Sequence, residues 1–264
     1  MKDMLWALWR YRFFVGTSIR NDLRSRFTRS SLGALWMILQ PLAQVAIYAL
    51  VLSRVLATKL PGIDSQYAYV IYLTSGILSW ALFAEILSRC LTIFVDNGNL
   101  MKKVVFPRMC LPLIVGGSAL VNNLLLMAAT VGVFLIIGHN PGWSVLWLLL
   151  LVPLTLAFSL GLGLVLGTLN VFVRDVGQIM NVVIQLWFWL TPIVYMPSIV
   201  PDRFKIFISL NPMYTLVLAY QNVLLFGKSP DLLQLGHVAV LSMILLLLAF
   251  VLFRRSSAEM VDVL

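Results

Sequence analysis

Long apolar runs separated by short polar stretches make up most of this chain of 264 residues. A helix that crosses a bilayer needs about 20 mostly apolar residues, and runs of that length predict six spans. Because lipid offers backbone polar groups no partner, and because the runs lack the alternation of barrel strands, we expect an all-α integral membrane protein. The expected spans form one transmembrane domain over residues 1–264 and cover 33–53, 67–88, 109–137, 145–173, 177–196 and 233–253.

The N-terminal segment 4–30 has a different pattern. Val15, Ile19, Leu23 and Phe27 recur every four residues and therefore share one helix face, while arginines lie around the other. A basic face opposite an apolar face predicts an amphipathic helix lying in the membrane interface. Two roles stay open for it: a simple anchor to anionic lipid, or a gate that meets a phosphate-bearing lipid.

The segment between the fifth and sixth spans, residues 197–232, is apolar in part, but Asn211-Pro212 divides it. Both halves are too short to cross a bilayer, because a residue before proline rarely continues a helix. We therefore predict an extracytoplasmic re-entrant or surface hairpin rather than a seventh span.

Composition and charge support this topology. The chain is 61% hydrophobic and 11% charged, against about 45–50% and about 25% in soluble domains. A net charge of +9 would suggest nucleic acid in a soluble protein, but here we expect no nucleic-acid partner, because lysine and arginine gather on the cytoplasmic side of membrane proteins. With both termini cytoplasmic, the only basic residues outside are Arg54, Lys59, Arg203, Lys205 and Lys228.

Within the spans, a few positions predict specific contacts. Ser159, Gly163 and Gly167 form a stripe of small residues that favours close helix packing. Glu85 and Arg89, four residues apart, are interpreted as an ion pair that reaches toward the cytoplasmic surface.

Signatures of catalysis, metal binding and ATP binding are missing from the sequence. The two cysteines have no metal-ligand spacing, and no nucleophile and base pattern is visible. Gly227-Lys228-Ser229 resembles the end of a phosphate-binding loop, but Asn222 stands where that loop needs glycine. Intramembrane acids are scarce, which argues against an ion-coupled transporter. We therefore expect no enzyme, no metal and no cofactor in this chain, and an energy source outside it.

The segment from Asn170 to Met196 combines a polar corner with an aromatic-rich run. One interpretation is a loop followed by an ordinary interfacial belt, where tryptophan and tyrosine are common. The other is a corner that receives force from outside the bilayer, joined to a surface that faces a transport path.

The order of several segments resembles the permease subunit of a type-two ABC exporter, in the branch that moves polysaccharides. The resemblance covers essentially the whole chain and rests on SSLGALWMILQPL, NLMKKVVFPR, NVFVRDVGQIM, WFWLTPIVY and LNPM. It implies a permease homodimer in the bacterial inner membrane with two cytoplasmic ATPase subunits, which hold ATP and magnesium. Its substrate would be an undecaprenyl-pyrophosphate-linked, O-antigen-like polysaccharide. Alternatives are the same architecture exporting a drug or small lipid, and a membrane enzyme or scaffold without transport.

The resemblance also implies roles for particular residues. The ATPase-coupling positions are Leu100, Met101, Lys102, Lys103, Val104, Phe106, Arg174 and Asp175. The gate residues that would meet the lipid pyrophosphate are Arg20, Arg24, Arg26 and Arg29. The positions expected along the glycan channel are Trp36, Gln40, Gln44, Tyr48, Gln185, Trp187, Phe188, Trp189 and Tyr195. Because residues 187–189 are consecutive in a helix, not all of them can face one path.

Overall fold

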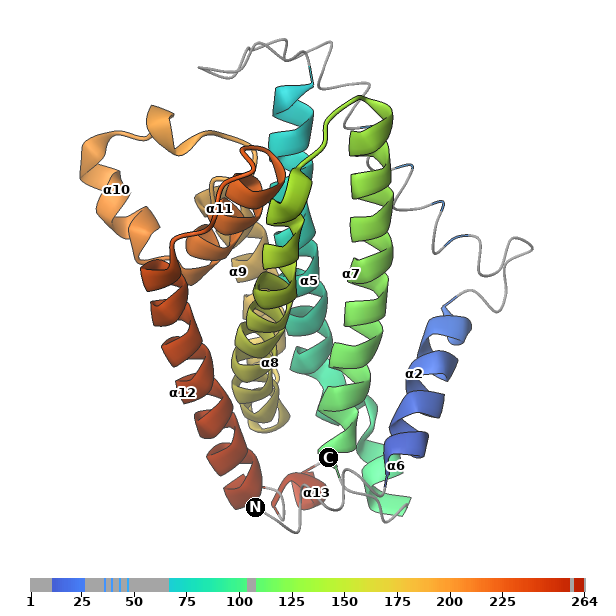
Figure 1. Ribbon diagram of the computed structural model, residues 1–264. Helices are drawn as coiled ribbons and strands as arrows, with labels where there is room; N and C mark the ends of the chain where they lie inside the picture. Colours follow the sequence, from blue (N-terminus) through green and yellow to red (C-terminus); the bar gives the residue numbers. More distant parts are fainter. Residues whose placement is uncertain are drawn as a thin grey trace.

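We describe the protein from a computed structural model that places residues 11–26, 36, 39, 43, 47, 67–103, 108–256 and 259–263. All regular structure in this part of the chain is helical (Figure 1). The elements are α2 (Arg12–Ser25), α5 (Ala68–Asp96), α6 (Gly98–Lys103), α7 (Cys110–Ile136), η3 (Gly142–Trp147), α8 (Leu148–Phe172), α9 (Asp175–Leu190), η4 (Pro197–Ile199), α10 (Asp202–Ser209), α11 (Pro212–Leu224), α12 (Leu232–Ser256) and α13 (Glu259–Val263).

Four helical segments are long and apolar enough to cross a membrane: α5, α7, η3 joined to α8, and α12. They correspond to four of the six predicted spans, although α5 continues to Asp96, past its predicted end at residue 88. α8 packs against both α5 and α12, and α7 lies on the other side of α5 (Figure 1). Of the predicted first span at 33–53, the structure describes only residues 36, 39, 43 and 47. Gln40, Gln44 and Tyr48 therefore lie outside the described residues.

Close packing at glycines joins the central helices. A Cβ added at Gly167 would overlap the carbonyl oxygen of Cys90 on α5, and one at Gly163 would lie 2.7 Å from the Cys90 Cβ. The predicted small-residue stripe is therefore confirmed as a packing surface, because any side chain there would separate α5 from α8. Cys90 and Cys110 are both buried and free.

The predicted fifth span, residues 177–196, needs correction. Its helix, α9, has 16 residues and ends at Leu190, which gives about 24 Å of length against a hydrocarbon thickness of about 30 Å. Thr191 precedes Pro192 and takes the extended conformation (φ −98°, ψ 129°) that a residue before proline prefers. Residues 191–196 therefore leave the helix, and the six-span count stays a prediction.

The segment from Asp202 to Leu224 forms two helices, α10 and α11, that meet at Asn211-Pro212, where the sequence predicted a break. Asn211 caps α11: its side-chain oxygen accepts from the backbone N–H of Met213 at 3.0 Å. α10 has no buried residue, whereas α11 buries most of its length, packing chiefly against α5.

The two ends of the helical bundle differ (Figure 1). One, which we call the α6 end, holds α6, the last turn of α12 and α13, and α13 contacts both α6 and α8. The other, the hairpin end, holds α10, α11 and the start of α12. α5, α7, α8 and α12 run between them, so each span links the two ends.

α2 lies beside α7. Val15, Ile19 and Leu23 are half-buried, and Arg20 is exposed, as the amphipathic pattern predicted. The helix covers Arg12–Ser25 rather than the predicted 4–30, and residues 27–30, with Arg29, lie outside the described part of the chain.

Candidate functional site

The predicted coupling loop forms a short helix, α6, at the α6 end. Met101 is buried and Lys102 is exposed, so one side of α6 packs on the bundle while the other presents charge. Leu100 and Lys103 belong to α6 by backbone, and Val104 and Phe106 lie outside the described residues. α6 therefore has a surface that a second protein can contact.

The second predicted coupling position, Arg174 with Asp175, lies at the exposed corner between α8 and α9. Asn170 at the end of α8 holds this corner. Its side-chain amide donates to the Leu91 carbonyl on α5 at 2.8 Å, and its oxygen accepts from the Gly177 backbone N–H at 2.7 Å. Because Asn170 bonds this corner to both α5 and α9, we expect the corner and the two helices to move together.

Sequence reasoning did not identify Asn170 as part of the site. The available signal was an amide inside an apolar run, followed seven positions later by Gly177. A Cβ on Gly177 would lie 2.9 Å from the Asn170 side-chain oxygen, so glycine permits the close approach that the hydrogen bond needs.

A network of two carboxylates and two guanidinium groups attaches α2 to α5. Arg26 lies 2.8 Å from Glu85, and Arg89 lies 2.8 Å from Asp22. Within each helix the distances are longer, 3.5 Å for Asp22–Arg26 and 3.8 Å for Glu85–Arg89. The predicted Glu85–Arg89 pair therefore exists, but the shorter contacts of both residues reach across to α2.

α7 completes this network. Asn122 donates to Glu85 at 2.8 Å, and Arg89 donates to the Ser118 hydroxyl at 3.0 Å. The four charged side chains are 19–30% exposed, so they are partly shielded from water. The two positive and two negative charges cancel, so this network holds α2 in place and does not attract an anion.

The apolar contact of α2 with α7 is also tight. A Cβ added at Gly117 would overlap the end of the Ile19 side chain, whereas one at Gly132, further along α7, would meet nothing within 4 Å. A side chain at position 117 would therefore require the end of the Ile19 side chain to move.

One face of α9 is exposed over the full length of the helix. Gln178, Asn181, Gln185 and Trp189 lie along it, and Trp189 is 64% exposed. No hydrogen bond within the described residues engages the three amide side chains. Amides are rare on lipid-facing helix surfaces, so this face suits a partner chain or a water-lined path.

The other aromatic residues of α9 pack against α5 of the same chain. The Trp187 ring lies edge-on to Phe83, with centroids 5.1 Å apart, and the Phe188 ring lies 5.6 Å from Trp80. Of the predicted channel positions on α9, Gln185 and Trp189 therefore face outward, while Trp187 and Phe188 face α5. Tyr195 is half-buried, and Trp36 is exposed.

The irregular segment 191–196 is held by side chains from distant helices. Its carbonyl oxygens accept hydrogen bonds from Tyr69 to Val194 at 2.8 Å, from Tyr72 to Tyr195 at 3.0 Å and from Gln221 to Pro192 at 3.3 Å. Non-helical backbone at membrane depth is tolerated only where protein or water satisfies it. These bonds satisfy the carbonyl groups of Pro192, Val194 and Tyr195.

Asn211 links this segment to the hairpin. Its oxygen accepts from the Trp187 indole N–H at 2.9 Å, and its amide donates to the Thr191 hydroxyl at 2.9 Å. Asn211 therefore ties the end of α9 to the start of α11, which sequence reasoning had identified only as a break.

Several known proteins are similar in sequence to this chain. An O-antigen export system permease protein, RfbA, of Klebsiella pneumoniae is 30% identical over 222 residues, covering 82% of each chain. RfbA of Myxococcus xanthus is 28% identical over 257 residues, covering 97% of this chain and 96% of that protein. The polysialic acid transport protein KpsM of Escherichia coli is 21% identical over 244 residues, covering 90% and 92%. Residues 15–225 match the sequence model of the ABC-2 type transporters, and this chain belongs to that family of membrane proteins.

Proposed function

We propose that this chain is the permease of an ATP-driven exporter that moves an undecaprenyl-pyrophosphate-linked, O-antigen-like polysaccharide across the bacterial inner membrane. The observation that carries the proposal is the similarity, over nearly all of both chains, to permeases named for O-antigen export. In this proposal ATP and magnesium bind to two cytoplasmic ATPase subunits, and two copies of this chain form the path.

The α6 end is proposed to be cytoplasmic and to receive the ATPase. Lys102, Arg254 and Arg255 lie at this end, and basic residues favour the cytoplasmic side. Both termini would then be cytoplasmic, and the hairpin end would face outward. α6 and the Arg174–Asp175 corner would dock on the ATPase, and the rigid attachment of the corner through Asn170 would pass its movement to α5 and α9.

We propose that α2 is the gate beside which the lipid-linked glycan enters. Arg20, Arg24 and Arg29 would meet the pyrophosphate, because guanidinium groups bind phosphate oxygens through a preformed pair of donors. Arg26, also predicted for this role, is engaged with Glu85 in the described arrangement. It therefore supports the position of α2, and the pyrophosphate would reach it only after that pair opens.

The glycan path is proposed to lie along the exposed face of α9, between two copies of the chain. Gln185 and Trp189 offer the two contacts that a sugar ring needs, because hydroxyl groups bond to amides and the apolar ring face packs on an aromatic surface. Trp36, Gln40, Gln44 and Tyr48 of the predicted first span would line the same path.

Deletion of this gene in its source bacterium tests the proposal. We expect loss of the surface polysaccharide and accumulation of the lipid-linked polymer on the cytoplasmic side, with both reversed by the wild-type chain. Surface polysaccharide at the parental level in the deletion strain would refute the proposal. Loss of export of a small lipid or a drug, with normal polysaccharide, would support the small-molecule alternative.

A further inference from the structure

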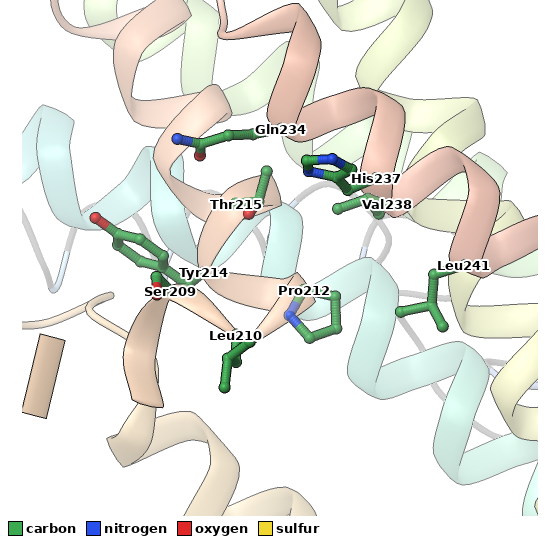
Figure 2. A pocket seen from close by; sticks show the side chains of 9 residues that line it. All are labelled: Ser209, Leu210, Pro212, Tyr214, Thr215, Gln234, His237, Val238 and Leu241. Carbon is green, nitrogen blue, oxygen red and sulfur yellow. The ribbon is translucent and has the colours of Figure 1, made fainter. Parts of the chain in front are cut away.

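A cavity of about 390 Å³ opens at the hairpin end, between the α10–α11 junction and the first turns of α12 (Figure 2). Its polar lining comes from the side chains of Ser209, Tyr214, Thr215, Gln234 and His237. Its volume falls within the range of about 300–1,000 Å³ that is usual for small-molecule sites. The cavity lies far from the α6 end and has no place in the coupling scheme.

The polar side chains around this cavity are available for hydrogen bonds to a ligand. No hydrogen bond within the described residues engages the side chains of Tyr214, Thr215, Gln234 or His237. Gln234 and His237 are exposed, so a ligand that enters the cavity can replace water as their hydrogen-bond partner.

The arrangement on α12 agrees with this interpretation. Gln234, His237 and Leu241 are spaced at i, i+3 and i+7, so they share the face that lines the cavity. From Val238 to Phe253 this helix is otherwise apolar apart from Ser242, whose hydroxyl donates to the Val238 carbonyl at 2.7 Å. The uncommitted polar groups of α12 are thus concentrated at the cavity.

The lining selects a class of ligand. It has no Lys, Arg, Asp or Glu, so it offers no counter-charge to a phosphate or a metal ion. It mixes hydroxyl, amide and imidazole groups with a tyrosine ring and with the apolar Pro212 and Leu241. A neutral sugar ring requires this combination, because its hydroxyls need hydrogen-bond partners and its apolar face packs on an aromatic ring.

We propose that this cavity binds one neutral sugar residue of the exported glycan on the outer side of the membrane. The inference rests on the proposed function, which it deepens by adding a glycan contact beyond the path along α9. Binding at the exit would hold the emerging chain while the permease resets, and so would oppose its backward movement.

A second, neighbouring cavity of about 330 Å³ supports an extended ligand. It shares Ser209 and Tyr214 with the first and is also lined by Lys205. The Lys205 ammonium is paired with Asp202 at 2.7 Å and lowers the pKa of that carboxyl below its usual range. Because the charge of Lys205 is already matched, the second cavity can accept the next neutral residue of a linear chain.

The test measures binding of a defined probe to the complete transporter in nanodiscs. The probe is the repeat-unit oligosaccharide released from the source bacterium's own surface polysaccharide, titrated by saturation-transfer NMR. The double variant Gln234→Leu/His237→Leu removes the polar groups of α12, and both side chains are exposed, so the substitutions disturb no core packing. Leu233→Ala, at an exposed neighbouring position, is the matched control.

We expect the double variant to weaken binding by about tenfold or more, which corresponds to the loss of two modest hydrogen bonds. Tyr214→Phe should weaken it about threefold, and Leu233→Ala should leave it unchanged. Equal affinity of the double variant and the wild type would overturn the proposal, as would displacement of the sugar signal by short-chain phosphatidylglycerol, which would mark a lipid site. Either result leaves the deletion phenotype intact, so failure here is distinct from failure of the proposed function.

Discussion

α5 is held near both of its ends by residues from distant parts of the chain, but the chemistry of the two attachments differs. Toward the α6 end, Glu85 and Arg89 bind α2 through charged pairs with Arg26 and Asp22. At the hairpin end, Tyr69 and Tyr72 bind the irregular segment 191–196 through neutral hydrogen bonds to carbonyl oxygens. The first attachment holds a peripheral helix, and the second holds a break inside the bundle.

This difference suits the proposed roles of the two regions. A partly exposed ion pair contributes only about 0–1 kcal/mol, because water and salt compete for each charge. A helix seated by such pairs can leave its place at low cost, as a gate must. The backbone carbonyls of segment 191–196 are buried or half-buried, and a buried one that loses its partner costs about 1–3 kcal/mol. We therefore expect segment 191–196 to be held more firmly than α2.

The largest effect is expected at Asn211. Asn211→Leu removes the partners of the Trp187 indole, the Thr191 hydroxyl and the Met213 backbone N–H together. We expect local destabilisation of about 3 kcal/mol, seen as faster hydrogen exchange across residues 212–218. Asn211→Asp keeps both acceptor contacts and should lose less than half as much. Wild-type exchange in the leucine variant would show that the hairpin end does not depend on this residue.

Charge inversion on one helix should have the next largest effect. Glu85→Arg/Arg89→Glu keeps the net charge but brings like charges together across α2 and α5. We expect α2 to loosen by about 2 kcal/mol, which makes the exchange of its amides about thirtyfold faster.

The inversion can be reversed from the other helix. Adding Asp22→Arg/Arg26→Asp restores alternating charges, and Asn122 and Ser118 can each serve as donor or acceptor for either sign. We expect the fourfold variant to recover most of the wild-type protection. If it behaves like the double variant, the network is not what seats α2, and Arg26 regains its place among the proposed pyrophosphate contacts.

A smaller effect is expected from packing. Gly117→Ala should push Ile19 and α2 away from α7 and cost about 1 kcal/mol. Gly132→Ala on the same helix has open space, so it should be neutral or slightly stabilising. Hydrogen exchange of the α2 amides in both variants measures the difference. Equal exchange in the two variants would mean that Gly117 does not limit the approach of α2 to α7.

The smallest expected effect is that of salt, which weakens the ion pairs of α2 but not the neutral hydrogen bonds at the hairpin end. Raising sodium chloride from 0.1 M to 1 M shortens the Debye length from about 10 Å to about 3 Å. Hydrogen exchange of α2 should become a few times faster, while exchange of residues 212–218 should stay within error. A salt effect of the same size in both regions would contradict the contrast between them.

Local signals in the sequence predicted much of the fold. Apolar run length identified the four spans, and the Gly163 and Gly167 stripe identified a close packing surface, which the structure places against α5. Asn211-Pro212 marked the break between α10 and α11, because a residue before proline rarely continues a helix. The end of α9 carried a signal too, since Pro192 disfavours a helical Thr191, but the apolar character of residues 191–196 outweighed it.

Local sequence patterns could not predict which residues attach α5 to α2 and to segment 191–196. Arg89 and Asp22 are 67 residues apart, and Tyr72 and Tyr195 are 123 apart. No periodicity links such pairs, because they meet only when helices from separate parts of the chain pack together. For the same reason the sequence could not tell that Trp187 faces inward and Trp189 outward until α5 defined the inner side of α9.

The proposed function requires that this chain receive work from a separate ATPase bound at the α6 end. Reconstitution in proteoliposomes with the native lipid-linked glycan, with and without the partner ATPase, tests it most directly. We predict ATP-dependent translocation only when both proteins are present. It should be lost in Lys102→Glu/Lys103→Glu and kept in Lys228→Glu at the hairpin end. Translocation by the purified chain alone would contradict the account.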